Sequence, residues 1–259
     1  MKQRSFSVLG NIAIVNFPDN TFNQIQKKKF AEEILQKNKA VKTVLEKSGK
    51  FSGRLRKQET KFLTGEKNKE VLYKENNCVF RFNIDTTYFS PRLSNERKEI
   101  AQKIKNNDEV LVMFAGVAPF SIVIAKNSRA KKIYSNEINR EANKYAKLNL
   151  ELNKLKNKIE LLPGDIKKIQ PKIKNKFDVI VMPRPQLKDS FLEQAFKLSK
   201  KGTRIYYYDF CKIDELDSIV EKVKLEAKKA KKKIKIASKK LAGDIAPYKY
   251  RVRVDFIVV

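Results

Sequence analysis

The sequence predicts a doubly wound α/β domain that follows a small α+β unit. Across residues 78–259, short apolar runs alternate with amphipathic helical patterns, which is typical of a parallel sheet with helices on both faces. The run at 110–114 is apolar at every position, as in strands that are buried on both faces. This alternation begins only at about Cys78. We therefore expect two domains, a small one at 1–77 and a larger one at 78–259.

The small unit is expected to combine short strands with one helix. The pattern at 7–15 indicates a strand, a turn and a second strand. Apolar side chains recur at a helical period across 24–37, at Ile25, Phe30, Ile34 and Leu35. Further strands are expected at 41–45 and 71–73, and a basic segment at 47–61 lies between them.

The larger domain contains the alternating elements. Strands are expected at 110–114, 132–135, 159–162, 177–182 and 203–208, and helices at 117–125, 141–153, 190–199 and 214–232. The last two strands, at 234–236 and 250–259, are joined by a loop that contains Gly and Pro but no helix. Because a parallel pair needs a long crossover, we expect these two strands to pair antiparallel.

The charge of the chain points to a polyanionic partner. Its 259 residues include 58 basic and 29 acidic side chains, which give a formal net charge of +29. A hydrophobic fraction of 41% is enough for a buried core and excludes a disordered basic tail. Membrane insertion is also excluded, because no run of ~18 apolar residues and no signal-peptide core occurs. Nucleic acid is the expected partner, and the alternative is a surface of merely solvated lysines, as in the runs 27–29 and 228–233.

The chain has no histidine and only two cysteines, Cys78 and Cys211. This composition excludes His-based triads, His metal clusters and a disulfide framework. We therefore expect no metal site, and we expect the protein to act in the reducing cytoplasm. Proton transfer then falls to a carboxylate, a lysine or a tyrosine.

Three expected strand ends carry residues that suit a nucleoside cofactor. Small residues around Gly116, in the loop 114–120, allow backbone amides to approach a ligand at a helix N-terminus. Glu137 follows 21 residues later, which is the spacing of a ribose-binding acid, and Asp165 after the next strand can accept from an adenine amino group. A single glycine favours an S-adenosylmethionine methyltransferase over an NAD enzyme. The alternative is an ordinary loop with a capping acid.

Two further segments are candidates for the chemistry. In 88–97, Ser94 and Asn95 are residues typical of helix N-caps, and Glu96 in the first turn is a candidate general base. The alternative is a capped helix with solvated charges. In 179–186, Pro183 stands where amino-methyltransferases carry Asn or Asp. Either that site is degenerate or the target is not an exocyclic amino group.

Together these segments resemble a known family. The matching pieces are 9–15, 41–45, 88–97, 113–120, Asn139, 164–165, 206–208 and 246–248. They are similar to the archaeal class I tRNA methyltransferases that convert guanosine 37, beside the anticodon, to 1-methylguanosine. The resemblance implies a Rossmann-like class I S-adenosylmethionine-dependent methyltransferase sheet with a small N-terminal α+β domain.

The chain departs from the family pattern in three respects: two substitutions near the cofactor loop, an N-terminal domain and the loop after a buried strand. Val112 stands where family members usually have Asp, and Ala118 stands where they have Gly. The additional N-terminal domain, which grips the outer corner of tRNA in the family, is expected to be lacking. The loop 183–185 resembles a bifunctional subgroup that also methylates C7 of the wyosine precursor imG-14 to give imG2.

The resemblance also implies roles for individual residues. Glu96 corresponds to the general base that takes the guanine N1 proton, and Arg56 to the arginine that stabilises charge on O6. Arg97 and Pro183 correspond to positions that tune guanine against wyosine substrates. The implied cofactor pocket consists of Tyr88, Phe114, Ala115, Gly116, Val117, Pro119, Glu137, Asn139, Asp165 and Pro185.

The implied partner is the anticodon stem-loop of tRNA, with tRNA-Phe as the expected substrate and a monomeric enzyme. Basic residues in 47–61 and 222–240 are expected to contact phosphates. Two alternatives remain open. One is a wyosine aminocarboxypropyl transferase with the same fold and cofactor, and the other is a non-catalytic tRNA-binding protein with a degenerate methyltransferase fold.

Overall fold

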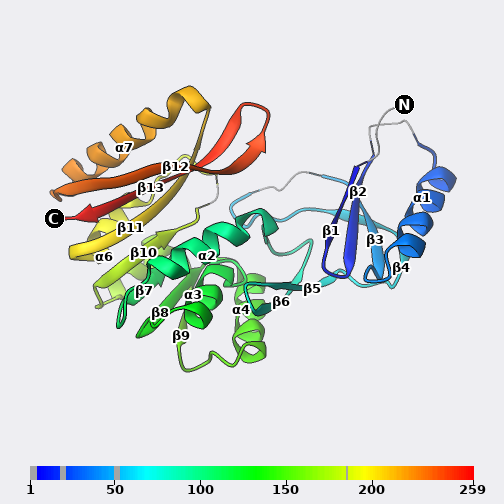
Figure 1. Cartoon of the computed structure of the whole chain (residues 1–259), viewed down its shortest axis with the longest axis horizontal. Helices are drawn as coiled ribbons and strands as arrows, with labels where there is room; N and C mark the ends of the chain where they lie inside the picture. The colour runs from blue at the N-terminus through cyan, green and yellow to red at the C-terminus, as the bar shows by residue number, and fades with distance from the viewer. Residues whose placement is uncertain (1–4, 18–21, 50–52, 185) are drawn as a thin grey trace.

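Three sheets organise the computed structural model, which describes residues 5–17, 22–49, 53–184 and 186–259 (Figure 1). The first sheet has the strand order β1-β2-β3-β4, the second is the hairpin β5-β6, and the third has the order β12-β13-β11-β10-β7-β8-β9.

The first sheet forms the small N-terminal unit. β1 (Ser5–Leu9) and β2 (Ile12–Asn16) pair antiparallel, and α1 (Gln24–Lys37) crosses over to β3 (Thr43–Lys47), which is parallel to β2. β4 (Thr60–Gly65) then pairs antiparallel with β3. The sequence pattern does not predict β4, because this edge strand begins within the basic segment and leaves most of its side chains partly or fully exposed. The unit has its own apolar core, which includes Val15, Ala31 and Val44.

A hairpin connects the small unit to the large sheet. β5 (Glu70–Glu75) and β6 (Cys78–Asn83) are joined by Asn76 and Asn77, both in the left-handed region with φ 48° and 61°. Val71 of β5 belongs to a core cluster that contains both Ile12 of the small unit and Val110 of the large sheet. The expected domain boundary at residue 77 lies in the turn of this hairpin.

The third sheet is doubly wound, as the sequence predicts. β7 (Glu109–Val112), β8 (Lys132–Glu137), β9 (Ile159–Pro163), β10 (Phe177–Met182) and β11 (Ser199–Cys211) run parallel. The helices α2 (Ser94–Lys103), α3 (Pro119–Asn127) and α4 (Arg140–Leu152) cover one face. α5 (Ile166–Ile169), α6 (Leu192–Leu198) and α7 (Leu216–Lys229) cover the other face (Figure 1). Three short 3-10 turns, η1 (Pro91–Leu93), η2 (Gln170–Lys172) and η3 (Ile213–Glu215), complete the described elements.

Two antiparallel strands extend this sheet beyond β11. β13 (Lys249–Val258) pairs antiparallel with both β11 and β12 (Ile234–Ala246), so the predicted antiparallel pair is confirmed. The predicted loop between them is wrong in its extent, because β12 continues through Gly243 and the turn contains only Pro247 and Tyr248. Irregular register at several points in β12 accommodates this length.

The predicted helix cap at Ser94 and Asn95 is also wrong. Ser94 is the first residue of α2, and the N-cap residue is Leu93, which makes no side-chain cap hydrogen bond. The hydroxyl and carbonyl oxygens of Ser94 instead accept hydrogen bonds from the amide of Asn76 in the β5–β6 turn. α2 is therefore fixed by the preceding 3-10 turn and by the hairpin.

Candidate active site

A pocket opens at the carboxyl ends of the parallel strands, where a doubly wound sheet binds its ligands. The space between its lining atoms measures about 640 Å³, with the solvent at its open mouth included. Residues from both the small unit and the large sheet line it: Arg54, Leu55, Arg56, Tyr88, Leu93, Phe114, Gly116, Glu137, Ile138, Asn139, Ala142, Pro183, Arg184, Phe210 and Arg251.

The loop between β7 and α3 forms one wall of this pocket. Phe114, Gly116 and Ala118 have φ angles of 58°, 58° and 67°, so left-handed residues alternate with ordinary ones along the loop. Such an alternation turns successive backbone amides toward one side and makes a concave binding surface. A Cβ atom on Gly116 would lie 3.3 Å from the carbonyl oxygen of Tyr88, so a side chain there would crowd the pocket wall.

Glu137 ends β8 and points across this loop. Its Oε2 accepts from the amide of Gly116 at 2.8 Å, and its Oε1 accepts from the amide of Asn139 at 2.7 Å. Burial raises the pKa of Glu137, although hydrogen bonds from these backbone amides oppose the shift. A half-buried carboxylate at this strand end is placed to accept from vicinal hydroxyls.

Asn139 lines the pocket and also hydrogen-bonds to three segments that surround it. Its Oδ1 caps α4 by accepting from the amide of Glu141 at 3.0 Å. Its Nδ2 donates to the carbonyl oxygens of Thr86 at 2.9 Å and Leu55 at 3.3 Å. One side chain thus connects the helix, the segment before α2 and the arginine-rich loop of the small unit.

Asp165 lies beside this pocket rather than in it. It lines a smaller adjoining pocket together with Phe114, Asn136 and Ile138. Its carboxylate forms an ion pair with Arg54 at 2.9 Å. Burial alone would raise the pKa of Asp165, but the hydrogen bond from Arg54 and one from the amide of Lys167 lower it.

Two arginines make part of the lining strongly cationic. The guanidinium of Arg56 lies 4.5 Å from the centre of the Tyr88 ring. Arg251 is 7% exposed and lies 5.5 Å from the centre of the Phe210 ring. Desolvation lowers the pKa of Arg251, and the Tyr88 phenol opposes that shift through a hydrogen bond. An electron-rich group of a substrate would find two guanidinium groups beside aromatic faces here.

Comparison with known proteins identifies the family. A family model described as the TRM5/TYW2 methyltransferase domain matches residues 71–237, and one described as the TYW2 N-terminal domain matches residues 2–68. The chain belongs to the TRM5/TYW2 methyltransferase family. The expected family and the Rossmann-like fold with a small N-terminal domain are therefore confirmed.

Individual relatives cover nearly the whole chain. It is 33% identical to the tRNA (guanine(37)-N(1))-methyltransferase Trm5b of Pyrococcus abyssi, over 98% of this chain and 74% of that protein. The crystal structure of P. abyssi Trm5b superposes with a TM-score of 0.86, at 32% identity, over the same shares of both chains. The tRNA (guanine(37)-N(1))/4-demethylwyosine(37)-methyltransferase Taw22 of Nanoarchaeum equitans is 33% identical over 98% of this chain and 100% of its own. A complex of aTrm5 with tRNALeu gives a TM-score of 0.84 at 31% identity, covering 98% of this chain and 72% of that one.

The TRM5/TYW2 family uses S-adenosylmethionine, and the pocket fits this cofactor. Glu137 suits the ribose hydroxyls, and the small side chain of Gly116 leaves its loop open to the ligand. Among the described residues, no group of three or more His, Cys, Asp and Glu side chains lies close enough to hold a metal ion. Within the same ranges, no helix has the length and apolar character needed to span a membrane.

The structure brings seven of the expected site residues into the pocket lining. They are Arg56, Tyr88, Phe114, Gly116, Glu137, Asn139 and Pro183. Ala115, Val117 and Pro119 are buried and do not line the pocket. Pro185 lies outside the described residues.

Arg97, expected to tune the substrate, is buried away from the lining. Its guanidinium pairs with Glu75 of β5, with Nη2 to Oε2 at 2.6 Å, and donates to the carbonyl oxygen of Ser90 at 3.0 Å. It is 1% exposed and lies 5.0 Å from the centre of the Phe89 ring. These contacts give Arg97 a role in fixing α2 against the hairpin.

Glu96 does not line the pocket either, but it lies near it along the sheet. Phe210 and Arg251 are register partners on β11 and β13, and both line the pocket. The next pair on the same face is Tyr208 with Arg253, and both side chains hydrogen-bond to Glu96. Two residues along a strand cover about 7 Å, so the residues that hold Glu96 are the direct neighbours of the pocket-lining pair along both strands.

Sequence reasoning missed Arg184, Phe210 and Arg251 as lining residues. Arg184 is buried, forms an ion pair with Asp209 and donates to the carbonyl oxygen of Asp189 at 2.7 Å, so it fixes the loop after β10. Phe210 and Arg251 come from antiparallel strands, whose pairing register places them at the pocket. The alternation of basic and apolar residues at 249–254 was the available signal.

Proposed function

We propose that the chain transfers a methyl group from S-adenosylmethionine to tRNA, at N1 of guanosine 37 and at C7 of imG-14 (4-demethylwyosine) in the same position. The observation that carries this proposal is the pocket itself. It joins a ribose-binding carboxylate, Glu137, to a cationic wall formed by Arg56 and Arg251. The names of the P. abyssi and N. equitans relatives support the two reactions.

The proposed chemistry depends on proton removal from the purine. When bound, S-adenosylmethionine supplies an electrophilic methyl group. Guanine N1 carries a proton and is a poor nucleophile until that proton leaves. Glu96 takes the proton while Arg56 stabilises the negative charge that develops on O6. Each effect is typically worth about 10²–10⁴ in rate.

The loop after β10 is proposed to admit the larger tricyclic substrate. Pro183 lines the pocket and offers no side-chain hydrogen bond. Its neighbour Arg184 holds the loop through Asp209. A rigid loop without an amide leaves room for the extra ring, while Glu96 removes the proton displaced by methylation at C7. Pro183→Asn should therefore lower the ratio of C7 to N1 methylation, and an unchanged ratio would contradict this role.

The proposed RNA partner is the anticodon stem-loop, with tRNA-Phe as the substrate and a monomer as the active form. Arg54 and Arg56 lie in the basic segment 47–61 and reach the pocket, which supports a path for RNA along this segment. We assign the small unit within residues 1–77 to positioning that RNA, and 78–259 to catalysis. Both cysteines are free and buried, which is compatible with action in the cytoplasm.

A direct test incubates the protein with S-adenosylmethionine and with tRNA that carries either guanosine or imG-14 at position 37. Nucleoside mass analysis should show 1-methylguanosine and imG2. A product heavier by an aminocarboxypropyl group would instead identify the transferase alternative. No product, together with no cofactor binding in calorimetry, would identify a non-catalytic RNA-binding protein.

A further inference from the structure

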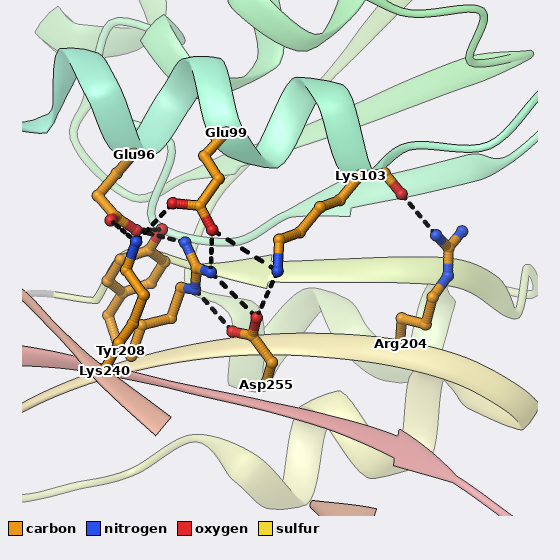
Figure 2. A network of polar contacts seen from close by, with 8 residues as sticks. Glu96, Glu99, Lys103, Arg204, Tyr208, Lys240 and Asp255 are labelled. Atoms are coloured by element: carbon orange, nitrogen blue, oxygen red, sulfur yellow. Dashed lines mark hydrogen bonds and ion pairs between the residues drawn. The ribbon is translucent and has the colours of Figure 1, made fainter. Parts of the chain in front are cut away.

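A network of charged side chains surrounds Glu96 behind the pocket. Glu96 and Glu99 extend from α2 toward Tyr208, Lys240 and Asp255, which come from β11, β12 and β13 (Figure 2). At its centre lies the guanidinium of Arg253, which is fully buried.

Arg253 contacts three carboxylates with its three nitrogens. Nη1 lies 2.5 Å from Oε2 of Glu96, Nη2 lies 2.6 Å from Oε1 of Glu99, and Nε lies 2.6 Å from Oδ1 of Asp255. A buried cation with this many partners is held in one orientation, because moving it would leave charges unpaired away from water. Arg253 therefore holds its three carboxylate partners in fixed positions.

The two carboxylate oxygens of Glu96 have different surroundings. Oε2 accepts from Nη1 of Arg253 and from Oη of Tyr208 at 2.8 Å, and both donors are fully buried. Oε1 is bound by Nζ of Lys240 at 2.8 Å. The side chain of Lys240 is 36% exposed and already contacts Oε2 of Glu99 at 2.5 Å. Lys240 can therefore leave Glu96 and keep an ion pair.

From this division we infer that Tyr208 and Arg253 are positioning residues that fix the Glu96 carboxylate through Oε2, so that Oε1 is the atom that accepts the substrate proton. The inference rests on the proposed function, because it assigns the role of proton acceptor to Glu96. Tyr208 and Arg253 are register partners, and the neighbouring pair on the same face is Phe210 with Arg251 in the pocket wall. The two paired strands thereby connect the pocket wall directly to the residues that hold Glu96.

The charged groups around Glu96 are arranged to keep this geometry at working pH. Burial and the neighbouring Glu96 charge hold the pKa of Tyr208 well above its usual value, so the phenol remains a donor. The other charged groups that surround Glu96 are Glu99 from the same helix, Lys240 from β12, and Arg253 and Asp255 from β13. Lys103 joins this network because its Nζ lies 3.0 Å from Oδ2 of Asp255.

The test compares Tyr208→Phe with Tyr206→Phe in the full-length protein. Both residues lie on β11, two positions apart, and only Tyr208 donates to Glu96. At saturating tRNA and near neutral pH, Tyr208→Phe should lower kcat about tenfold to a hundredfold through misplacement of Oε1. The acidic limb of kcat against pH should move to higher pH, because one donor to the charged form is removed. KM for both substrates should stay unchanged. Tyr206→Phe should change none of these values.

A double-mutant comparison separates positioning from general damage. In a Glu96→Gln background, Tyr208→Phe should have no further effect on kcat, because its influence passes through the carboxylate. Equal losses in both backgrounds, or an unmoved acidic limb, would overturn the inference. Arg253→Lys, which retains one charge but not the fork of donors, gives an independent second measurement with the same expected direction.

The proposed function fails in a different way. If the wild-type protein methylates neither nucleoside, or if Glu96→Gln retains full activity, the assignment of Glu96 itself is wrong. If Glu96→Gln lowers activity but Tyr208→Phe lowers kcat equally with and without Glu96, only the positioning role of Tyr208 is contradicted.

Discussion

Asn139 lines the pocket and is also expected to contribute to the free energy of unfolding. Replacing it with Ala removes the cap of α4, typically worth about 1 kcal/mol. It also removes two hydrogen bonds, to Thr86 at 2.9 Å and Leu55 at 3.3 Å, typically worth about 0.5–1.5 kcal/mol each. Asn139 is 4% exposed, so water cannot fully replace these partners. We expect Asn139→Ala to cost about 2–4 kcal/mol.

The measurement is urea unfolding followed by circular dichroism, for the wild type and two variants. Asn139→Ser keeps an oxygen that can cap α4 but removes the donors to Thr86 and Leu55. The Ser variant should therefore lie about 1 kcal/mol above the Ala variant in stability. A destabilisation below about 0.5 kcal/mol for Asn139→Ala, or equal destabilisation in both variants, would refute this account of the hydrogen bonds.

Three further predictions concern charge. Glu137→Gln should weaken S-adenosylmethionine binding at least tenfold in calorimetry, and equal affinity of the variant and the wild type would contradict the ribose assignment. Burial raises the pKa of Glu137. The affinity of the wild type should therefore begin to fall on acidification at a pH above the usual Glu range. Burial raises the pKa of Glu99, but hydrogen bonds from Arg253 and Lys240 outweigh it and lower the pKa to about 2. Since a lowered pKa stabilises the fold above the ordinary Glu value, Glu99→Gln should cost about 1–2 kcal/mol at pH 7 in urea unfolding, with solvent screening included. This cost should shrink as the pH falls below about 4.5, and a pH-independent cost would contradict it. Lys228 and Lys235 are exposed. Replacing both by Gln should reduce the slope of log K for tRNA binding against log salt concentration by about 0.9 for each phosphate that the variant no longer neutralises. An unchanged slope would exclude these two lysines from the tRNA-binding surface.

The sequence predicts the parallel part of the fold well, because buried strands such as 110–114 need apolar side chains at every position. It predicts β4 and most of β12 poorly. Lysines and small polar residues interrupt the apolar ones across 235–241, and every second position there is exposed. An edge strand of this kind has no distinct pattern until its partner is known.

Site residues that follow parallel strands are predictable from the sequence, whereas those that antiparallel pairing brings into place are not. Gly116, Glu137 and Asn139 follow neighbouring parallel strands, whose carboxyl ends meet at one edge of the sheet. Arg251 and Arg253 reach their places only through pairing of β13 with β11, and Arg253 contacts Glu96 across 157 residues of sequence. No spacing rule predicts such a contact without the topology.

The position of β13 also has a consequence for biosynthesis. A nascent chain that ends before residue 249 contains the β7–α3 loop, Glu137 and Asn139, and so holds part of the pocket lining. It lacks both Arg251 and Arg253. While the protein is being translated, the pocket therefore lacks a cationic lining residue and Glu96 lacks its buried guanidinium partner until β13 has left the ribosome and joined the sheet.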